Sequence, residues 1–507
     1  MSATSPDSHA ARIKTISERV KYFYSRNEKF RIYHGSTSTT RATVLSRANT
    51  VDTSQMKHVI GVDKANKTIT VEPKVSMVEL VNATLEHGLL PPVVMEFPAI
   101  TVGGGFAGTS GESSSFKYGF FDNTVDRIEI VLADGEVVWA SKDERADLFN
   151  AAAGTFGTFG VITSLRIPLI DASRYVRVTF QPTYTLQGSI SGLEESIQDT
   201  TNDYVEGIMF SKQEGIIITG RLTDKQDPEL PVTCYTRPHD TWFYLRAQEV
   251  LKKARKSKSS TAVSEIVPIK DYLFRYDRGA FWAGMYGFRY MVAPFTHFMR
   301  YLLDPLMHTA TMYHAMHKSH MADQYVVQDI GFPHSKLGAF IDYTDETMGF
   351  YPLWLCPLKM QGDLSLRPRD QSTYMQDSRY PKSMINVGLW GPGAKDYDKF
   401  VKLNREIEHK TAELGGLKCF YAQAFYTEEE FWKIYDKEWY DELRAKYKAS
   451  SLPTVYEKVN AAYLKWKPKS EQTFQERMKG RMQRLRPFNG IYGTFHAMLK
   501  KDYLLKQ

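Results

Sequence analysis

A stretch rich in glycine and serine runs from Thr101 to Gly119 and reads TVGGGFAGTSGESSSFKYG. Three of its glycines, Gly103, Gly105 and Gly108, match the spacing G-x-G-x-x-G. Glycine lets the backbone approach a ligand closely, and threonine and serine hydroxyls can bind phosphate oxygens or a ring carbonyl. The stretch is therefore a candidate for a dinucleotide-binding turn, for a flavin-binding segment, or for a plain turn between strands.

A dinucleotide fold requires a strand before the glycines, a helix that starts at the last glycine, and an acidic residue about 20 positions later. The glycines here are followed by the run 109–115, TSGESSS, which forms helices poorly. The strand expected over residues 99–102 is short, because Pro91, Pro92 and Pro98 precede it. This context disfavours the dinucleotide interpretation.

Strands and one helix flank the glycine-rich stretch. Two short apolar runs in residues 58–73 predict a pair of strands, and the capping box from Ser76 to Glu79 begins a helix that ends at Gly88. Downstream, RIEIVLADGEVVWAS alternates on both sides of Asp134-Gly135, which predicts a hairpin. After about residue 171 the pattern changes to long segments rich in aromatic residues and methionine.

The composition is that of an ordinary water-soluble protein. The 507 residues are 42% hydrophobic and 24% charged, and the net charge of +7 gives little support to nucleic-acid binding. Three widely spaced cysteines suggest neither a disulfide framework nor a metal site, and they fit a reducing compartment. No secretory signal or uninterrupted membrane-spanning run is present.

Several segments together resemble a known flavoprotein family. They are EPKVSMVELVNATLEHGLLPPV, TVGGGFAGTSGESSSFKYGFFDN, EIVLADGEV and DLFNAAAGTFGTFGVITSLRIPLI, with YVVQD, YPLWLCP and YAQAFYTEEEFWKIYD further on. They are similar to the FAD-binding domain of the vanillyl-alcohol oxidase and p-cresol methylhydroxylase (PCMH) type, and most closely to the Δ24-sterol reductase (seladin/Diminuto) family. The resemblance implies an α+β fold, with a two-subdomain FAD-binding domain at 31–172 and an α+β cap domain at 173–459. An N-terminal helical arm would cover 1–30 and a basic extension 460–507.

The resemblance places FAD on three segments, and it implies non-covalent binding although His34 lies near the first. In the first segment the pyrophosphate would meet Gly35, Ser36, Thr37 and Ser38. The second would lie along the flavin with Thr101, Val102, Gly103, Gly104, Gly105, Gly108, Thr109, Ser110, Ser113 and Ser114. The third would contribute Gly154, Gly157, Gly160, Val161 and Ile162.

The implied reaction is reduction of a carbon–carbon double bond in a sterol side chain by NADPH through FAD, and it needs an acid in a dry pocket. Near the flavin segment the ionisable candidates are Glu112, Lys117 and Tyr118; the cap segments offer Tyr325, Asp329 and Tyr421. Each also has a structural interpretation: Glu112 can cap the amides of the serine run, Lys117 can hold a phosphate, and Tyr118 can pack.

Other functions stay open. The same chemistry could serve another lipophilic alkene such as a terpenoid, an oxidase could use oxygen, and a lipid-binding protein could have lost the flavin. The aromatic segment 281–307 could line an apolar pocket, face a membrane or form core helices, and the basic run 251–260 could touch anionic lipid or be solvated. We expect a cytoplasmic protein without a membrane anchor, peripheral on the endoplasmic reticulum membrane, with the oligomeric state undetermined.

Overall fold

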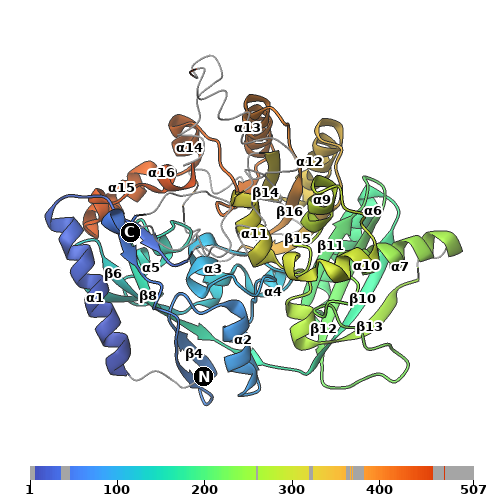
Figure 1. The fold of residues 1–507 in the computed structure, drawn as a ribbon, viewed down its shortest axis with the longest axis horizontal. Coiled ribbons are helices and arrows are strands. Elements are labelled where there is room, and N and C mark those ends of the chain that lie inside the picture. The colour runs from blue at the N-terminus through green and yellow to red at the C-terminus, as the bar shows by residue number, and fades with distance from the viewer. Residues whose placement is uncertain are drawn as a thin grey trace.

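The computed structural model describes residues 6–35, 46–258, 261–318, 324–360, 366, 368, 382–460 and 473. Within these residues, two main β-sheets are surrounded by helices (Figure 1). The predicted α+β class is therefore confirmed. The predicted domain boundaries stay predictions, and the extension from 460 to 507 lies almost wholly outside the described residues.

In the described residues the first sheet has five antiparallel strands, in the order β3, β4, β8, β6, β7. Their bounds are β3 Val59–Asp63, β4 Thr68–Val71, β8 Gly160–Pro168, β6 Arg127–Leu132 and β7 Val137–Ser141. The predicted hairpin joins β6 to β7, and Gly135 takes the left-handed conformation, φ +86°, that glycine adopts without strain. Two small pairs complete this part: β1 (Arg31–Tyr33) with β2 (Thr50–Asp52), and β5 (Leu89–Leu90) with β9 (Ile170–Asp171).

The capping box predicted at Ser76 begins helix α2, Met77–Leu85. The Glu79 carboxylate accepts the Ser76 amide at 2.9 Å, and Met77, Leu80 and Val81 of this helix are buried. The remaining helices of this part are α1 Pro6–Ser25, η1 Arg47–Asn49, α3 Val102–Gly108, α4 Ser115–Tyr118, η2 Phe121–Thr124 and α5 Ala146–Ala152.

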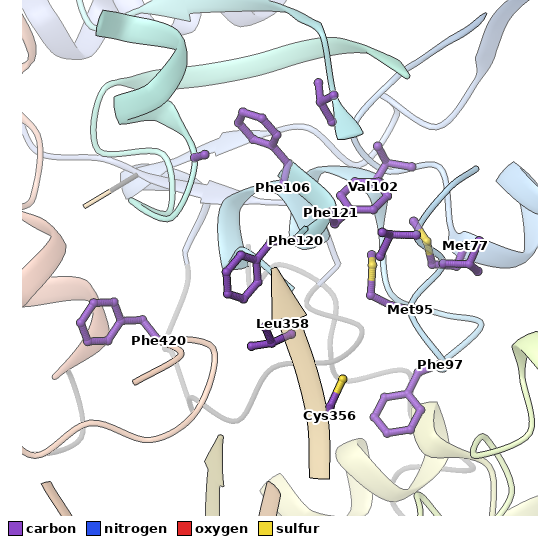
Figure 2. Packing of buried hydrophobic residues seen from close by; sticks show 14 of the residues in the cluster. Met77, Met95, Phe97, Val102, Phe106, Phe120, Phe121, Cys356, Leu358 and Phe420 are labelled. Atoms are coloured by element: carbon purple, nitrogen blue, oxygen red, sulfur yellow. The ribbon is translucent and has the colours of Figure 1, made fainter. Parts of the chain in front are cut away.

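The glycine-rich stretch is a helix where the sequence predicted a loop, and the strand expected before it is wrong. Residue Thr101 makes only an isolated bridge with Ser76, and its hydroxyl then caps α3 by accepting the Gly104 amide at 3.1 Å. Val102 and Phe106, one turn apart, are fully buried and point into the core shown in Figure 2. Packing of this apolar face overrides the poor helix propensity of the glycines.

The second sheet, within the described residues, has eight strands in the order β13, β10, β12, β11, β15, β16, β14, β17, all antiparallel where they pair. Their bounds are β13 Val263–Pro268, β10 Tyr175–Thr183, β12 Gly215–Thr223, β11 Tyr204–Met209, β15 Leu353–Lys359, β16 Ser383–Pro392, β14 Tyr325–Phe332 and β17 Leu417–Lys418. Because side chains alternate along a strand, the two faces of this sheet meet different surroundings.

Three helices cover one face of the second sheet: α6 (Leu186–Gln198), α12 (His334–Thr347) and α13 (Tyr397–Glu413). Val326, Leu355 and Val387 point to this side. The other helices of this half are α7 Phe243–Ser257, α8 Ile269–Leu273, α9 Ala283–Tyr290, α10 His297–Leu302, η3 Asp304–Leu306, α11 Thr309–Lys318, α14 Glu428–Ile434, α15 Lys437–Lys446, η6 Ala449–Ser451 and α16 Val455–Val459.

The opposite face of the second sheet turns toward the half of the molecule that holds the glycine-rich stretch and the first sheet. Strand β15 brings Leu358 against Phe120, and Cys356 and Phe97 lie close by in the same close view (Figure 2). The aromatic segment 281–307 forms α9, α10 and η3. Helix α11 lies at the junction, while α10 lies toward α7 (Figure 1), where Arg300 contacts the Trp242 ring. The junction is therefore bounded by the first half, by the second sheet and by the segment from α9 to α11, which is called the roof below.

Candidate functional site

A cavity of about 440 Å³ lies at the junction of the two halves. Its walls come from α3 and β8 of the first half, from β14, β15 and β16 of the second sheet, and from the segment α9 to α11. The roof is rich in methionine, with Met291, Met307, Met312 and Met316 facing the space. A mostly apolar cavity with a few polar groups is the usual form of a small-molecule site.

Part of the predicted cofactor set lines the cavity. The lining residues from that set are Thr101, Gly103, Gly104, Ser110, Gly157, Gly160, Val161 and Ile162. Those that the structure describes and that do not line it are Gly35, Val102, Gly105, Gly108, Thr109, Ser113, Ser114 and Gly154. The helical form of α3 explains why Val102, Gly105 and Gly108 do not line the cavity, because this face of the helix is packed: a Cβ on Gly105 would lie 2.2 Å from the Met95 methyl carbon. Gly104, on the outer face, is exposed to the space.

One end of the cavity is cationic. Arg31 and Lys458 line it, and Lys458 also donates to the Phe156 carbonyl at 2.7 Å. Gly35, four residues after Arg31, has φ +98°, and a Cβ built on it would lie 3.6 Å from the Lys74 ammonium nitrogen. Ser36, Thr37 and Ser38, which the sequence assigned to the same pyrophosphate segment, lie outside the described residues.

His34 has a buried Nδ1 without a hydrogen-bond partner among the described residues, and its ring lines the same end of the cavity. Burial, followed by the Lys74 charge, lowers the pKa of His34, so the ring is neutral at pH 7. Glycine backbones, cations and an unused imidazole nitrogen together suit a diphosphate joined to a flat ring system. The residues present therefore fit FAD.

The three cap candidates for the acid come together at the cavity. Tyr325, Val327 and Asp329 lie two residues apart on β14, so all three point to the cavity face, and Tyr421 joins them from the segment before α14. The Tyr325 hydroxyl is buried, and none of the described residues hydrogen-bonds it. Burial keeps the pKa of Tyr325 and Tyr421 well above the usual value for tyrosine, so both are neutral donors.

Asp329 is held by donors from the neighbouring strand. Asn386 Nδ2 donates to its Oδ1 at 3.0 Å and Trp390 Nε1 to its Oδ2 at 3.2 Å, and Tyr421 also hydrogen-bonds it. Gly388 lies directly opposite Asp329, which places both donors on the diagonals of the same face. Burial raises the pKa of Asp329 to about 7, although these hydrogen bonds oppose the shift.

The three acid candidates nearest the glycines do not line the cavity. Glu112 is buried. It accepts hydrogen bonds from Arg275 Nη2 at 2.8 Å, from the Ser113 hydroxyl and from the Ser114 amide, so it caps an amide of the serine run as its structural interpretation predicted. Lys117 pairs with Asp203 at 2.8 Å instead of facing a phosphate. Tyr118 is half-buried beside Lys117.

Arg275 joins the two halves of the molecule. Its guanidinium is fully buried and also donates to Glu206 of β11, with Nε at 3.0 Å and Nη2 at 2.9 Å from Oε1. Trp354 and Tyr276 donate to the second oxygen of Glu206. One cation thus lies between a carboxylate of the glycine-rich stretch and a carboxylate of the second sheet.

Sequence reasoning missed Glu96. It lies five residues before Thr101, between Met95 and Phe97, and all three line the cavity. Its side chain is buried, and burial, reinforced by the charge of Glu112, raises its pKa to about 8. A lone glutamate inside an apolar run, VVMEFP, was the available signal, because such a residue is seldom buried without a reason.

Comparison with known proteins agrees with this geometry. Residues 9–141 match the family model described as an FAD binding domain. The chain is 30% identical over 445 residues to the "Delta(24)-sterol reductase" of Arabidopsis thaliana, covering 80% of this chain and 76% of that one. The "Delta(24)-sterol reductase" of Homo sapiens is 26% identical (90% and 87% covered), and the "Delta(24)-sterol reductase homolog" of Caenorhabditis elegans is 28% identical (90% and 88% covered).

Proposed function

The chain belongs to the Δ24-sterol reductase family, and we propose that it uses FAD and NADPH to reduce the carbon–carbon double bond in the side chain of a sterol. The observation that carries this proposal is that the predicted cofactor segments and the polar residues of β14 line the same cavity. The bound flavin supplies hydride transfer. The residues of the protein must hold the alkene beside it, exclude water and supply a proton.

The cavity meets the binding and water-exclusion requirements. Its roof of methionines and its wall of Phe281, Trp354 and Trp390 form an apolar surface for a sterol side chain and nucleus. Arg31 and Lys458, at the other end, would hold the diphosphate of the cofactor, and the backbone at Gly103, Gly104, Gly157 and Gly160 would lie against its rings. We assign these roles to residues that line the cavity.

The polar side chains of β14 bear on the third requirement, the transfer of a proton to the alkene. An isolated trisubstituted alkene accepts hydride poorly, so a proton must reach the less substituted carbon while positive charge develops on the tertiary one. Of the six predicted catalytic residues, Asp329 alone is a carboxyl group in the cavity wall. We place Asp329 beside the carbon on which positive charge develops, with Tyr421 orienting its carboxyl group. The Tyr325 hydroxyl, which none of the described residues hydrogen-bonds, is available to the ligands.

The reaction can be tested by anaerobic stopped-flow measurements on the purified protein. We expect NADPH to bleach the flavin absorbance and desmosterol, a sterol with the Δ24 double bond, to restore it. Bleaching without restoration would reject desmosterol and favour another lipophilic alkene. A yellow protein that neither NADPH nor NADH bleaches would overturn the proposal in favour of an oxidase, and a colourless one that takes up no FAD would favour a lipid-binding protein.

We also propose that the protein collects its substrate from a lipid surface. No helix of the described residues is long and apolar enough to span a bilayer. Val292, Phe298, Tyr301 and Leu302, here called the α10 patch, are each more than half exposed. Val292 of the patch directly follows Met291, which lines the cavity, so one end of the patch lies next to the site in sequence.

Charge favours an anionic lipid surface as the occupant of the α10 patch. Between Arg278 and Leu303 the sequence holds no acidic residue, while Arg289 is exposed and Arg300 is partly so. The basic run predicted to touch lipid or to be a solvated loop is instead the exposed end of α7, with Lys252, Lys253, Arg255 and Lys256 facing solvent. The predicted location at the endoplasmic reticulum stays a prediction.

The double variant Phe298→Glu/Leu302→Glu should float with phosphatidylcholine–phosphatidylserine vesicles about tenfold less than the wild type, because it puts two charges where two apolar side chains would enter the interface. Vesicle flotation at low salt measures this. Val232→Glu, at an equally exposed apolar residue elsewhere, is the matched control. If both variants float as well as the wild type, the α10 patch does not bind the lipid surface.

A further inference from the structure

Two carboxyl groups from different halves of the molecule share the cavity. Glu96 comes from the segment between β5 and α3, and Asp329 comes from β14 of the second sheet. They are close enough for the Asp329 charge to raise the pKa of Glu96. When two such groups have different surroundings, one keeps its proton and the other ionises more readily.

The surroundings of Asp329 favour its ionised form. Asn386, Trp390 and Tyr421 all direct hydrogen atoms at its oxygens, and an indole N–H cannot accept a hydrogen bond in return. A carboxylate accepts all three, whereas a protonated carboxyl would have to turn one oxygen away from a donor. Asp329 is therefore the member of the pair that carries the negative charge.

The surroundings of Glu96 favour its protonated form. Among the described residues, no other side chain hydrogen-bonds or pairs with its carboxyl group, and its neighbours Met95 and Phe97 are apolar. Phe97 is fixed edge-on to Phe281 and Tyr313, with ring centroids 5.8 and 6.4 Å apart, so this segment is held against the roof. Its own backbone amide hydrogen-bonds the carboxyl group and lowers its pKa, but burial is the larger effect, and Glu96 lines the ligand space.

We propose that the Glu96 carboxyl group donates the proton to the less substituted alkene carbon, while the Asp329 carboxylate offsets the positive charge that develops on the tertiary carbon. This inference rests on the function proposed above. The Glu96 O–H bond breaks and the alkene π electrons form the new C–H bond. The tertiary carbon takes a hydride with its electron pair from the reduced cofactor, which is oxidised, and water returns a proton to Glu96.

The pH dependence follows from the groups that face Glu96. Burial raises the pKa of Glu96 most, and the charges of Glu112 and Asp329 raise it further. Its own backbone amide and Arg275 lower it, and the nearby hydroxyls of Tyr313 and Tyr421 stay neutral. With a pKa of about 8, Glu96 holds its proton below that pH and loses it above. We expect the rate at which the alkene re-oxidises the flavin to fall as pH rises through about 8, where Glu96 loses its proton, and to fall below about 7, where Asp329 gains one.

The decisive variant is Glu96→Gln, which keeps the size of the side chain and removes the acid. Its flavin absorbance and its bleaching by NADPH should match the wild type, while re-oxidation by desmosterol should slow by about 100-fold or more, the usual contribution of a general acid. Glu96→Asp should recover part of the rate. Glu194→Gln, which changes a buried carboxyl of α6 away from the cavity, is the matched control and should react like the wild type.

A second readout does not depend on turnover. Infrared difference spectra of the flavin-loaded protein should show a protonated carboxyl that titrates near pH 8 and is absent from Glu96→Gln. If the wild type fails to react with NADPH or the alkene, the proposed function falls. If the wild type reacts and Glu96→Gln re-oxidises within about twofold of it, or keeps the same infrared titration, the assignment of Glu96 is overturned while the function stands.

Discussion

Gly104→Phe should give a folded protein that purifies without flavin colour. Gly104 lies on the outer face of α3, is exposed to the cavity, and has only the Thr101 hydroxyl, at 2.9 Å, in the way of a Cβ. A phenyl ring there enters the space where the cofactor rings would lie, without disturbing the packed face of the helix. We expect FAD affinity to fall by about 100-fold or more, equivalent to about 2.7 kcal/mol.

Flavin absorbance of the purified protein and titration of the apoprotein with FAD measure this effect, and circular dichroism checks the fold. Gly61→Phe is the matched control, because a Cβ on Gly61 in β3 meets nothing within 4 Å and this glycine does not line the cavity. The control should stay yellow. Normal FAD loading of Gly104→Phe would show that the cofactor rings lie elsewhere.

Arg275→Met should destabilise the protein by about 3–5 kcal/mol, the usual loss when a buried ion pair loses one partner. Glu112 and Glu206, both buried, would then face each other without a cation. Burial already raises the pKa of Glu206, and removal of Arg275 raises it further. The protonated form is favoured in the folded state, so the loss should be smaller at pH 5 than at pH 8.

Urea unfolding at both pH values measures this change. Arg127→Met removes the cation of an exposed pair with Glu144 and should cost less than about 1 kcal/mol. Adding Glu206→Gln to Arg275→Met should restore part of the stability, because one of the two stranded carboxylates is gone. A loss no larger than that of Arg127→Met would mean that Arg275 does not hold the two halves together.

The sequence predicted the elements whose signals are local. The capping box at Ser76 and the hairpin at Asp134-Gly135 depend on neighbouring residues, and both are present. The form of the glycine-rich stretch was not predictable in this way, because its helix depends on Val102 and Phe106 packing against Met95 and Phe121 (Figure 2). The poor helix propensity of Gly103, Gly104 and Gly105 by itself predicts a loop.

The site was predicted in outline, and its details depend on contacts between distant residues. Segment resemblance led to Asp329 and Tyr421, yet the register that sets Gly388 opposite Asp329 is fixed only by the folded sheet. Glu112 is close to the glycines in sequence, but Arg275, more than 160 positions later, draws it away from the cavity. Glu96 was missed because the groups that make its surroundings unusual come from distant parts of the sequence.

The methionine roof has a consequence for selectivity and for chemical durability. A thioether side chain has three rotatable bonds and no branching, so Met291, Met307, Met312 and Met316 can follow the outlines of different ring systems. Such a roof would tolerate variation in the part of a substrate that it covers, while the proposed role of Glu96 and Asp329 requires a double bond beside them. The same sulfur atoms can be oxidised to sulfoxides. This would make the apolar roof of the cavity polar, and the enzyme would be sensitive to oxidative stress.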